Sequence, residues 1–163
     1  MKKLSAIFAI ITMFAAGSAN AQKIASMDYE SVLSAMPEAK KLTTDLDAFS
    51  KAKGDELNKQ AAAWQAEVEQ YQKAAGGLTE AQRAAKEEEL QKKQQNLQQL
   101  NLTAQTDLGK KREEGLKPII DKINAAVEKV SKANGFDFVI DSSALIYKGG
   151  ADATPLVKKE LGI

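Results

Sequence analysis

Carboxylates are the side chains in this sequence with the most obvious capacity for chemistry. The 163 residues include 22 Asp and Glu but no Cys and no His. Without those two residue types the chain cannot form a disulfide, the usual zinc site, or a Ser-His-Asp or Cys-His nucleophile. Paired carboxylates perform acid–base catalysis only where burial or a like-charged neighbour separates their pKa values. Nearly every carboxylate here lies in a charged, water-facing segment, so we expect neither an enzyme nor a cofactor or metal.

The first 21 residues have the pattern of a secretory signal peptide. Lys2 and Lys3 form a basic start, residues 4–16 are mostly apolar, and residues 19–21 (Ala-Asn-Ala) form a small-residue cleavage site. The apolar run is shorter than the ~20 residues of a membrane-spanning helix, and no cysteine is present to carry a lipid anchor. We therefore expect cleavage after Ala21 and a mature chain outside the cytoplasm.

The charge of the mature chain excludes one class of partner. Removal of Lys2 and Lys3 leaves 21 of the 23 basic residues against 22 acidic ones, so the net charge changes from +1 to −1. A nucleic-acid-binding surface would appear as a basic patch or stripe, which we do not find. The charge gives no indication of peripheral membrane or lipid contact either.

The middle of the chain predicts two long helices joined by a tight turn. Residues 38–75 contain no proline, and their apolar residues recur at helical spacing. Gly76 and Gly77 end this helix, and Thr79 followed by Gln82 is a capping box that begins the next one. We expect the tip of a helical hairpin at residues 76–79.

The register of this hairpin follows from its apolar residues. In an antiparallel pair of helices, the residue numbers of two facing residues add up to a constant. A constant of 154 brings large apolar residues together and places the apex of the hairpin at Gly77. The helices are then expected to pack through three pairs: Leu46 with Leu108, Leu57 with Leu97, and Trp64 with Leu90.

Gly115 and Pro118 weaken the second of the two predicted long helices, at the level where the hairpin should meet the rest of the protein. The same register places Pro37 opposite Pro118 within one residue. Proline removes a helical hydrogen bond and glycine adds backbone freedom, so this shoulder is a candidate hinge. A static kink is an equally good interpretation of the same residues.

The two ends of the mature chain should combine into a small head. Residues 23–27 read as a strand, Asp28 as the N-cap of a short helix, and Asn134-Gly135 as the end of the long helix. Residues 136–141 and 144–148 read as a β-hairpin, and Thr154 as the N-cap of a final helix. The predicted fold is α+β and predominantly helical, with a head (22–37 and 119–163) and a coiled-coil arm (38–118).

A head of this size is marginally stable by itself and has exposed strand edges. Oligomerisation would resolve both difficulties, and we expect a cyclic oligomer. The residues expected at the contact between subunits are apolar residues of the predicted strands: Ile24, Met27, Phe138, Ile140, Leu145 and Tyr147.

Over its whole mature length the chain resembles the Skp (OmpH-like) family of periplasmic chaperones. The residues that carry the resemblance are the segments 23–28 (KIASMD), 33–38 (LSAMPE) and 136–141 (FDFVID), followed by Tyr147 and by 152–154 (DAT). The resemblance implies a homotrimer whose heads share a β-barrel and whose hairpins surround a cavity like tentacles. It also implies that unfolded outer-membrane proteins are held there without ATP.

A purely structural role is the alternative. A coiled-coil spacer or scaffold of the cell envelope, with no client protein, would have the same helical periodicity. The sequence pattern therefore leaves both functions open.

Overall fold

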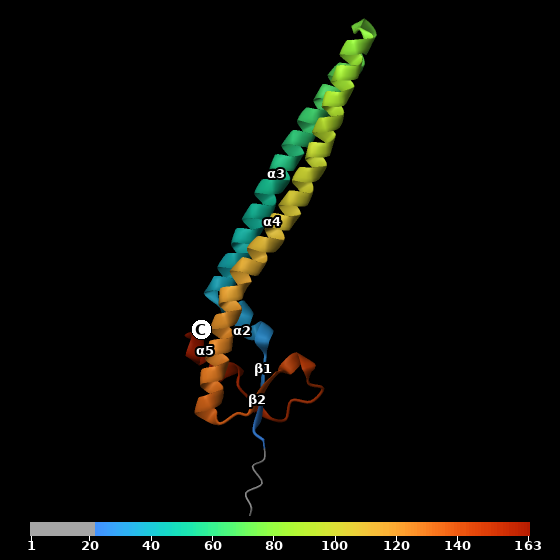
Figure 1. Ribbon diagram of the computed structural model, residues 1–163. Coiled ribbons are helices and arrows are strands. Elements are labelled where there is room, and N and C mark those ends of the chain that lie inside the picture. The colour runs from blue at the N-terminus through green and yellow to red at the C-terminus, as the bar shows by residue number, and fades with distance from the viewer. Residues whose placement is uncertain (1–21) are drawn as a thin grey trace, which may run out of the picture.

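The computed structural model describes residues 22–163, and the predicted signal peptide lies outside them. A long helical hairpin projects from a small head that contains both ends of the described chain (Figure 1). The predicted fold class, a predominantly helical protein with a small β-stranded head, is confirmed.

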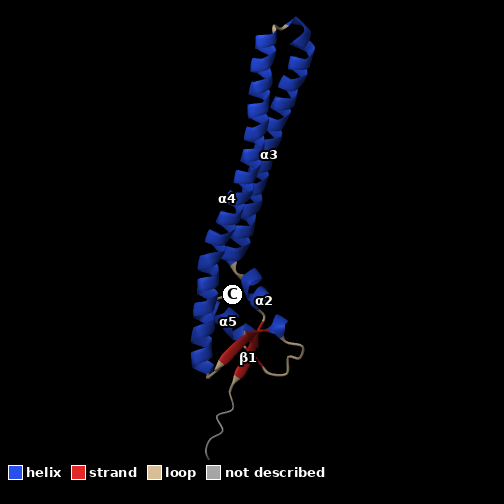
Figure 2. Ribbon diagram, turned by 45° about the vertical axis from the view of Figure 1, so that its right-hand side comes forward, coloured by secondary structure: helices blue, strands red, loops and turns tan. Residues whose placement is uncertain are grey.

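Two long helices form the hairpin. Helix α3 spans Pro37–Ala74 and α4 spans Glu80–Asn134, with a short 3₁₀ turn, η1, at Ala75–Gly77 between them. The helices lie side by side and antiparallel along the whole arm (Figure 2). The predicted capping box is present: Gln82 N donates to Thr79 Oγ1 at 3.3 Å, and Thr79 N donates to Gln82 Oε1 at 2.9 Å.

Helix α4 is continuous from the tip of the arm to the base of the head. It passes through Pro118 without a break and ends at Gly135, whose left-handed backbone (φ 66°) lets its N–H bond to Ser131 O. No helix end therefore marks the predicted boundary between residues 118 and 119. None of the helices within residues 22–163 combines the length and apolar character needed to cross a membrane.

The head is a three-stranded sheet covered by helices on one face. Strand β1 (Ile24–Met27) is central, with β2 (Phe138–Asp141) on one side and β3 (Ala151–Asp152) on the other, and both neighbours run parallel to it. Helix α2 (Tyr29–Ala35) is capped by Asp28, whose carboxylate accepts a hydrogen bond from Ser31 N at 2.8 Å. Helix α5 (Thr154–Leu161) follows β3.

The hydrophobic core lies between the inner face of the sheet and helices α2, α4 and α5. Its most deeply buried members are Val32, Met36, Ile123 and Val157. They come from segments at both ends of the chain, so the lower part of α4 belongs to the core of the head.

The β-hairpin predicted over residues 136–148 is wrong. Asp141 accepts a hydrogen bond from Ser143 N at 2.8 Å, and the 3₁₀ turn η2 (Ser142–Ala144) that follows leads the chain away from β2. Residues 144–148 form no strand, and β2 pairs with β1 instead.

Thr154 was also misassigned, by one position. It is the first residue of α5, and Ala153 occupies the cap position. The Thr154 hydroxyl is engaged elsewhere, because it accepts a hydrogen bond from Asp28 N at 3.0 Å and donates one to Asp152 Oδ1. It thus ties the start of α5 to the end of β1.

Candidate functional site

The outer face of the head sheet, opposite the helices, carries large apolar side chains. The register pairs Ile24 with Phe138 and Ser26 with Ile140, so these residues point to the same side of the sheet. Ile24 is 47% exposed, Phe138 51% and Ile140 37%. We call these three residues the outer apolar face, which remains partly exposed in the described chain.

A loop between β2 and β3 adds further exposed apolar surface. Ile146 and Tyr147 are almost wholly exposed, whereas Leu145 is partly buried. The Tyr147 ring lies over Gly149, where a Cβ would come within 2.3 Å of Tyr147 Cε1. A Cβ on Gly150 would lie 3.8 Å from Ile24 O, so the loop returns to the edge of the outer apolar face.

Met27 does not belong to this surface. Its side chain lies on the opposite side of β1 from Ile24 and is buried in the core of its own head, 5% exposed. Strand residues separated by an odd number of positions point to opposite faces, and Ile24 and Met27 are three positions apart. Met27 therefore exposes little surface, and its predicted place at the contact between subunits stays a prediction.

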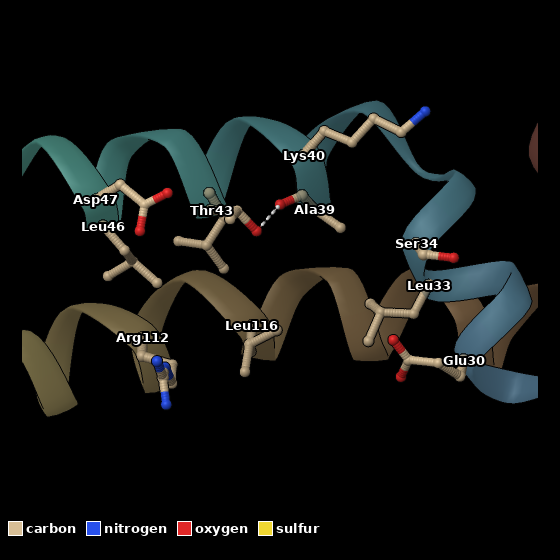
Figure 3. A pocket seen from close by; sticks show the side chains of 11 residues that line it. Glu30, Leu33, Ser34, Ala39, Lys40, Thr43, Leu46, Asp47, Arg112 and Leu116 are labelled. Carbon is tan, nitrogen blue, oxygen red and sulfur yellow. Dashed lines mark hydrogen bonds between the residues drawn. The ribbon is translucent and has the colours of Figure 1, made fainter.

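A groove lined by apolar side chains lies at the base of the arm, near the head (Figure 3). It has a volume of about 470 Å³, and Leu33 from α2, Leu46 from α3 and Leu116 from α4 line it. Arg112, Lys40, Glu30 and Asp47 stand at its edges, so cations and carboxylates balance there.

The predicted hinge residues lie beside this groove in different surroundings. Gly115 lies against Leu42, and a Cβ at Gly115 would come within 2.3 Å of Leu42 Cδ1. A larger residue at this position would therefore require the Leu42 side chain to move. Pro118 lies three residues further along within continuous helix. Whether this shoulder moves stays a prediction.

The distal part of the arm is held by polar contacts between the helices. Trp64 Nε1 donates a hydrogen bond to Leu90 O at 3.0 Å, which confirms the predicted facing of these two residues. Glu67 binds Lys93 at 2.6 Å and Lys86 at 3.5 Å, so it lies between two turns of α4. We call Trp64, Glu67, Lys86, Leu90 and Lys93 the distal clamp.

The charged residues of the distal clamp stabilise one another's ionised forms. A hydrogen bond from Lys93 lowers the pKa of Glu67 below its usual value. Hydrogen bonds from Lys86 and Lys93 lower the pKa of the neighbouring Glu89 from 4.5 to about 2. The clamp is therefore fully charged at neutral pH.

The remaining predicted packing residues are partly buried along the arm. Leu46 lines the groove at the base, Leu57 and Leu108 line a second groove further along, and Leu97 lies in a third groove beside Trp64. At the tip, Gly76 and Gly77 belong to the η1 turn and Thr79 to the capping box.

Sequence reasoning missed the ionic part of the distal clamp and the exposure of Ile146. The predicted register places Glu67 next to Lys86, so the sequence contained a signal for the ion pair. Ile146 was hidden by the wrong strand assignment for residues 144–148. Residues 22–163 contain no cluster of three or more Asp and Glu side chains placed to hold a metal ion.

Comparison with known proteins identifies the family. The family described as Outer membrane protein (OmpH-like) matches residues 23–161. The chain belongs to this OmpH-like family. Among its relatives, the chaperone protein Skp of Photorhabdus luminescens is 26% identical over 164 residues, covering 99% of both chains. The chaperone protein Skp of Yersinia enterocolitica is 24% identical over 137 residues, covering 84% of both.

A solved OmpH-like structure has the same fold. The protein from Caulobacter crescentus CB15 superposes with a TM-score of 0.77, covering 90% of this chain and 88% of that one. Its sequence is only 14% identical to this chain. The long hairpin on a small head is thus a fold that this OmpH-like chain shares with a distant relative.

Proposed function

We propose that the protein is an ATP-independent periplasmic holding chaperone that keeps unfolded outer-membrane proteins from aggregating. The observation that carries this proposal is the hairpin itself, a largely exposed polar arm whose two helices, within residues 22–163, pack on each other and on the head. The similar Skp proteins are named chaperones. That name agrees with the expectation that this chain is not an enzyme.

Association of three copies through their heads would complete the molecule. The outer apolar face exposes Ile24, Phe138 and Ile140, and β2 has an edge with no strand beside it. A second copy would remove this apolar surface from water and pair the open edge. In a closed ring of heads the arms would surround a common space in which a client is held.

Many weak contacts would hold such a client. The arm surface is mainly charged and polar, with isolated exposed apolar residues such as Leu102. The groove at the base of the arm offers a further apolar contact near the head. Contacts of this kind restrain an unfolded chain while still permitting its release.

Light scattering of a denatured outer-membrane β-barrel protein tests the proposal. The barrel protein is diluted from urea with and without the mature chain, and aggregation should be suppressed at about one trimer per client. Phe138→Asp provides a matched comparison, because a chain that cannot associate through its head should lose the suppression. An unchanged aggregation rate with the unaltered protein would favour the structural spacer or scaffold instead.

A further inference from the structure

Asn134, the last residue of α4, is followed by Gly135, and this is the only Asn-Gly step in the sequence. The backbone nitrogen of the residue after an asparagine can attack the side-chain amide carbon and displace ammonia. Glycine hinders this attack least, because it has no Cβ and its backbone reaches more conformations than that of other residues. By sequence alone, Asn134 is therefore the asparagine most exposed to this reaction.

The reaction is a deamidation, and water is its only co-reactant. The Gly135 nitrogen forms a bond to Asn134 Cγ while the bond from Cγ to the side-chain nitrogen breaks. The proton of the attacking nitrogen goes to the leaving group, which departs as ammonia. One water then opens the cyclic succinimide, either at Cγ to give aspartate or at the backbone carbonyl carbon to give isoaspartate. In isoaspartate the main chain runs through the former side chain.

The folded head holds both nitrogens that take part in this reaction. The Gly135 N–H donates a hydrogen bond to Ser131 O, and Asn134 Nδ2 donates one to Val130 O at 2.8 Å. The backbone carbonyl of Asn134 accepts a third hydrogen bond, from Lys23 Nζ at 2.7 Å. The attacking nitrogen and the leaving amide are thus bound to carbonyls of the last turn of α4, and the reaction requires these bonds to open.

Contacts from the other end of the chain hold this turn in place. Lys23 N donates to Asp137 Oδ2 at 2.8 Å, and Asp137 N donates to Lys23 O at 2.9 Å. Lys23 Nζ also lies 5.1 Å from the centre of the Phe136 ring. The surroundings of Asn134 are therefore complete only when the segment that leads into β1 has joined the end of α4.

We propose that Asn134 is a deamidation site that is protected while the head is folded and reactive while the head is open. Both products replace the amide donor to Val130 O with a carboxylate at the C-terminus of α4, where negative charge is unfavourable. Isoaspartate also adds one methylene group to the main chain between α4 and β2. A copy that has reacted does not regain the native head, so the reaction permanently removes chains whose head stays open.

Peptide mapping by mass spectrometry tests the protection. The mature chain is incubated at neutral pH with and without guanidinium chloride, and deamidation is followed at every asparagine. In the folded protein Asn134 should react at least about tenfold more slowly than in denaturant, because reaction is limited to the population of the open form. In denaturant it should react faster than the other asparagines of residues 22–163, all of which lie in α3 or α4 and precede larger residues: Asn58, Asn96, Asn101 and Asn124.

Two results of this mapping would overturn the proposal. One is an equal rate at Asn134 in the folded and the denatured protein, which would show that the head gives no protection. The other is a rate at Asn134 in denaturant that does not exceed those of the other asparagines.

A variant that weakens the core of the head tests whether opening of the head controls the reaction. Ile123 is fully buried in that core, and Ile123→Val should speed deamidation of Asn134 in the folded protein about two- to tenfold. Leu102→Val is the matched control, since Leu102 lies in the same helix but is 58% exposed, and it should leave the rate unchanged. An unchanged rate in Ile123→Val would show that the reaction does not pass through the open head.

Hydrogen exchange tests the effect of the product on the head. The isoaspartate form is separated from the unreacted chain by chromatography. Its residues 24–27 and 138–141 should exchange at least about tenfold faster than in the unreacted chain, whereas residues 61–71 of the arm should be unchanged. Equal protection of both strands in the two forms would overturn the proposed loss of the head.

Discussion

At the scale of single residues, glycine serves different purposes along one helix. Gly115 lies against the side chain of Leu42, whereas Gly109, six residues earlier in α4, faces open space. Both positions are helical, so alanine should bring the same gain in helix propensity at each, about 1 kcal/mol. Any difference between the two substitutions therefore measures the contact with Leu42.

We predict that Gly115→Ala is less stable than Gly109→Ala by about 1 to 3 kcal/mol, because the added methyl overpacks the contact with Leu42. Urea unfolding followed by circular dichroism measures this difference. In a Leu42→Ala background the two glycine substitutions should differ by less than about 0.5 kcal/mol, because the clashing side chain is gone. A difference that persists without Leu42 would show that another contact is responsible.

At the scale of elements, an ionised carboxylate joins α3 to α4 in the distal arm: Glu67 of α3 binds Lys93 of α4, and Glu89 of α4 binds the same lysine. Glu67 and Glu89 have pKa values that folding lowers, in the case of Glu89 from 4.5 to about 2. A group whose pKa is lowered by folding stabilises the folded state above its unfolded pKa. That stabilisation is lost as the pH falls toward the folded pKa.

The contact of Glu67 with Lys93 in the distal clamp should therefore weaken as the pH falls below about 4.5 and Glu67 takes up a proton. Trp64, the only tryptophan in the chain, reports on this region, and its fluorescence emission should shift to longer wavelength over that pH range. Glu67→Gln should weaken the acid dependence, because the carboxylate that joins the two helices is removed. Glu88→Gln is the control, since Glu88 pairs with Lys92 of the same helix. An identical titration for Glu67→Gln and the unaltered protein would contradict the ionic role of the clamp.

Local signals in the sequence predicted the helices well. The proline at the start of α3, the capping box of Thr79 and the glycine after Asn134 each act within a few residues of the helix end they define. The inward direction of Met27 was also available from strand alternation. Those features depend only on neighbouring residues, so no knowledge of the rest of the fold is needed.

The sheet could not be predicted in the same way. Residues 144–148 have a composition that suits a strand, but the hydrogen bond from Ser143 N to Asp141 directs the chain elsewhere. Strand β3 has only two residues, and its pairing with β1 is a contact between distant segments. The choice of strand partners depends on the packing of the whole head, which local composition does not contain.

At the scale of the whole molecule, the outer apolar face is the surface through which we propose that copies of the chain associate. We predict that Phe138→Asp shifts the mass in solution toward the monomer, because association would place a charge in an apolar contact without a partner. Light scattering coupled to size-exclusion chromatography measures the shift. Leu102→Asp is the matched control, since Leu102 is equally exposed but lies on the arm. If Phe138→Asp leaves the mass unchanged, the outer apolar face is not the contact.

The central position of β1 has a consequence for the order in which the protein is completed. Lys23, next to β1, bonds through its backbone N–H to Asp137, 114 residues later, and both neighbours of β1 come from the last part of the chain. During synthesis the residues of β1 are made first and those of its partner strands last. The helical hairpin, in contrast, is formed by two helices that follow each other directly in the sequence. The sheet is thus absent from any chain that stops short of residue 138. Copies truncated before β2 would lack the surface on which we propose association, so we expect only chains that extend past Ile140 to associate.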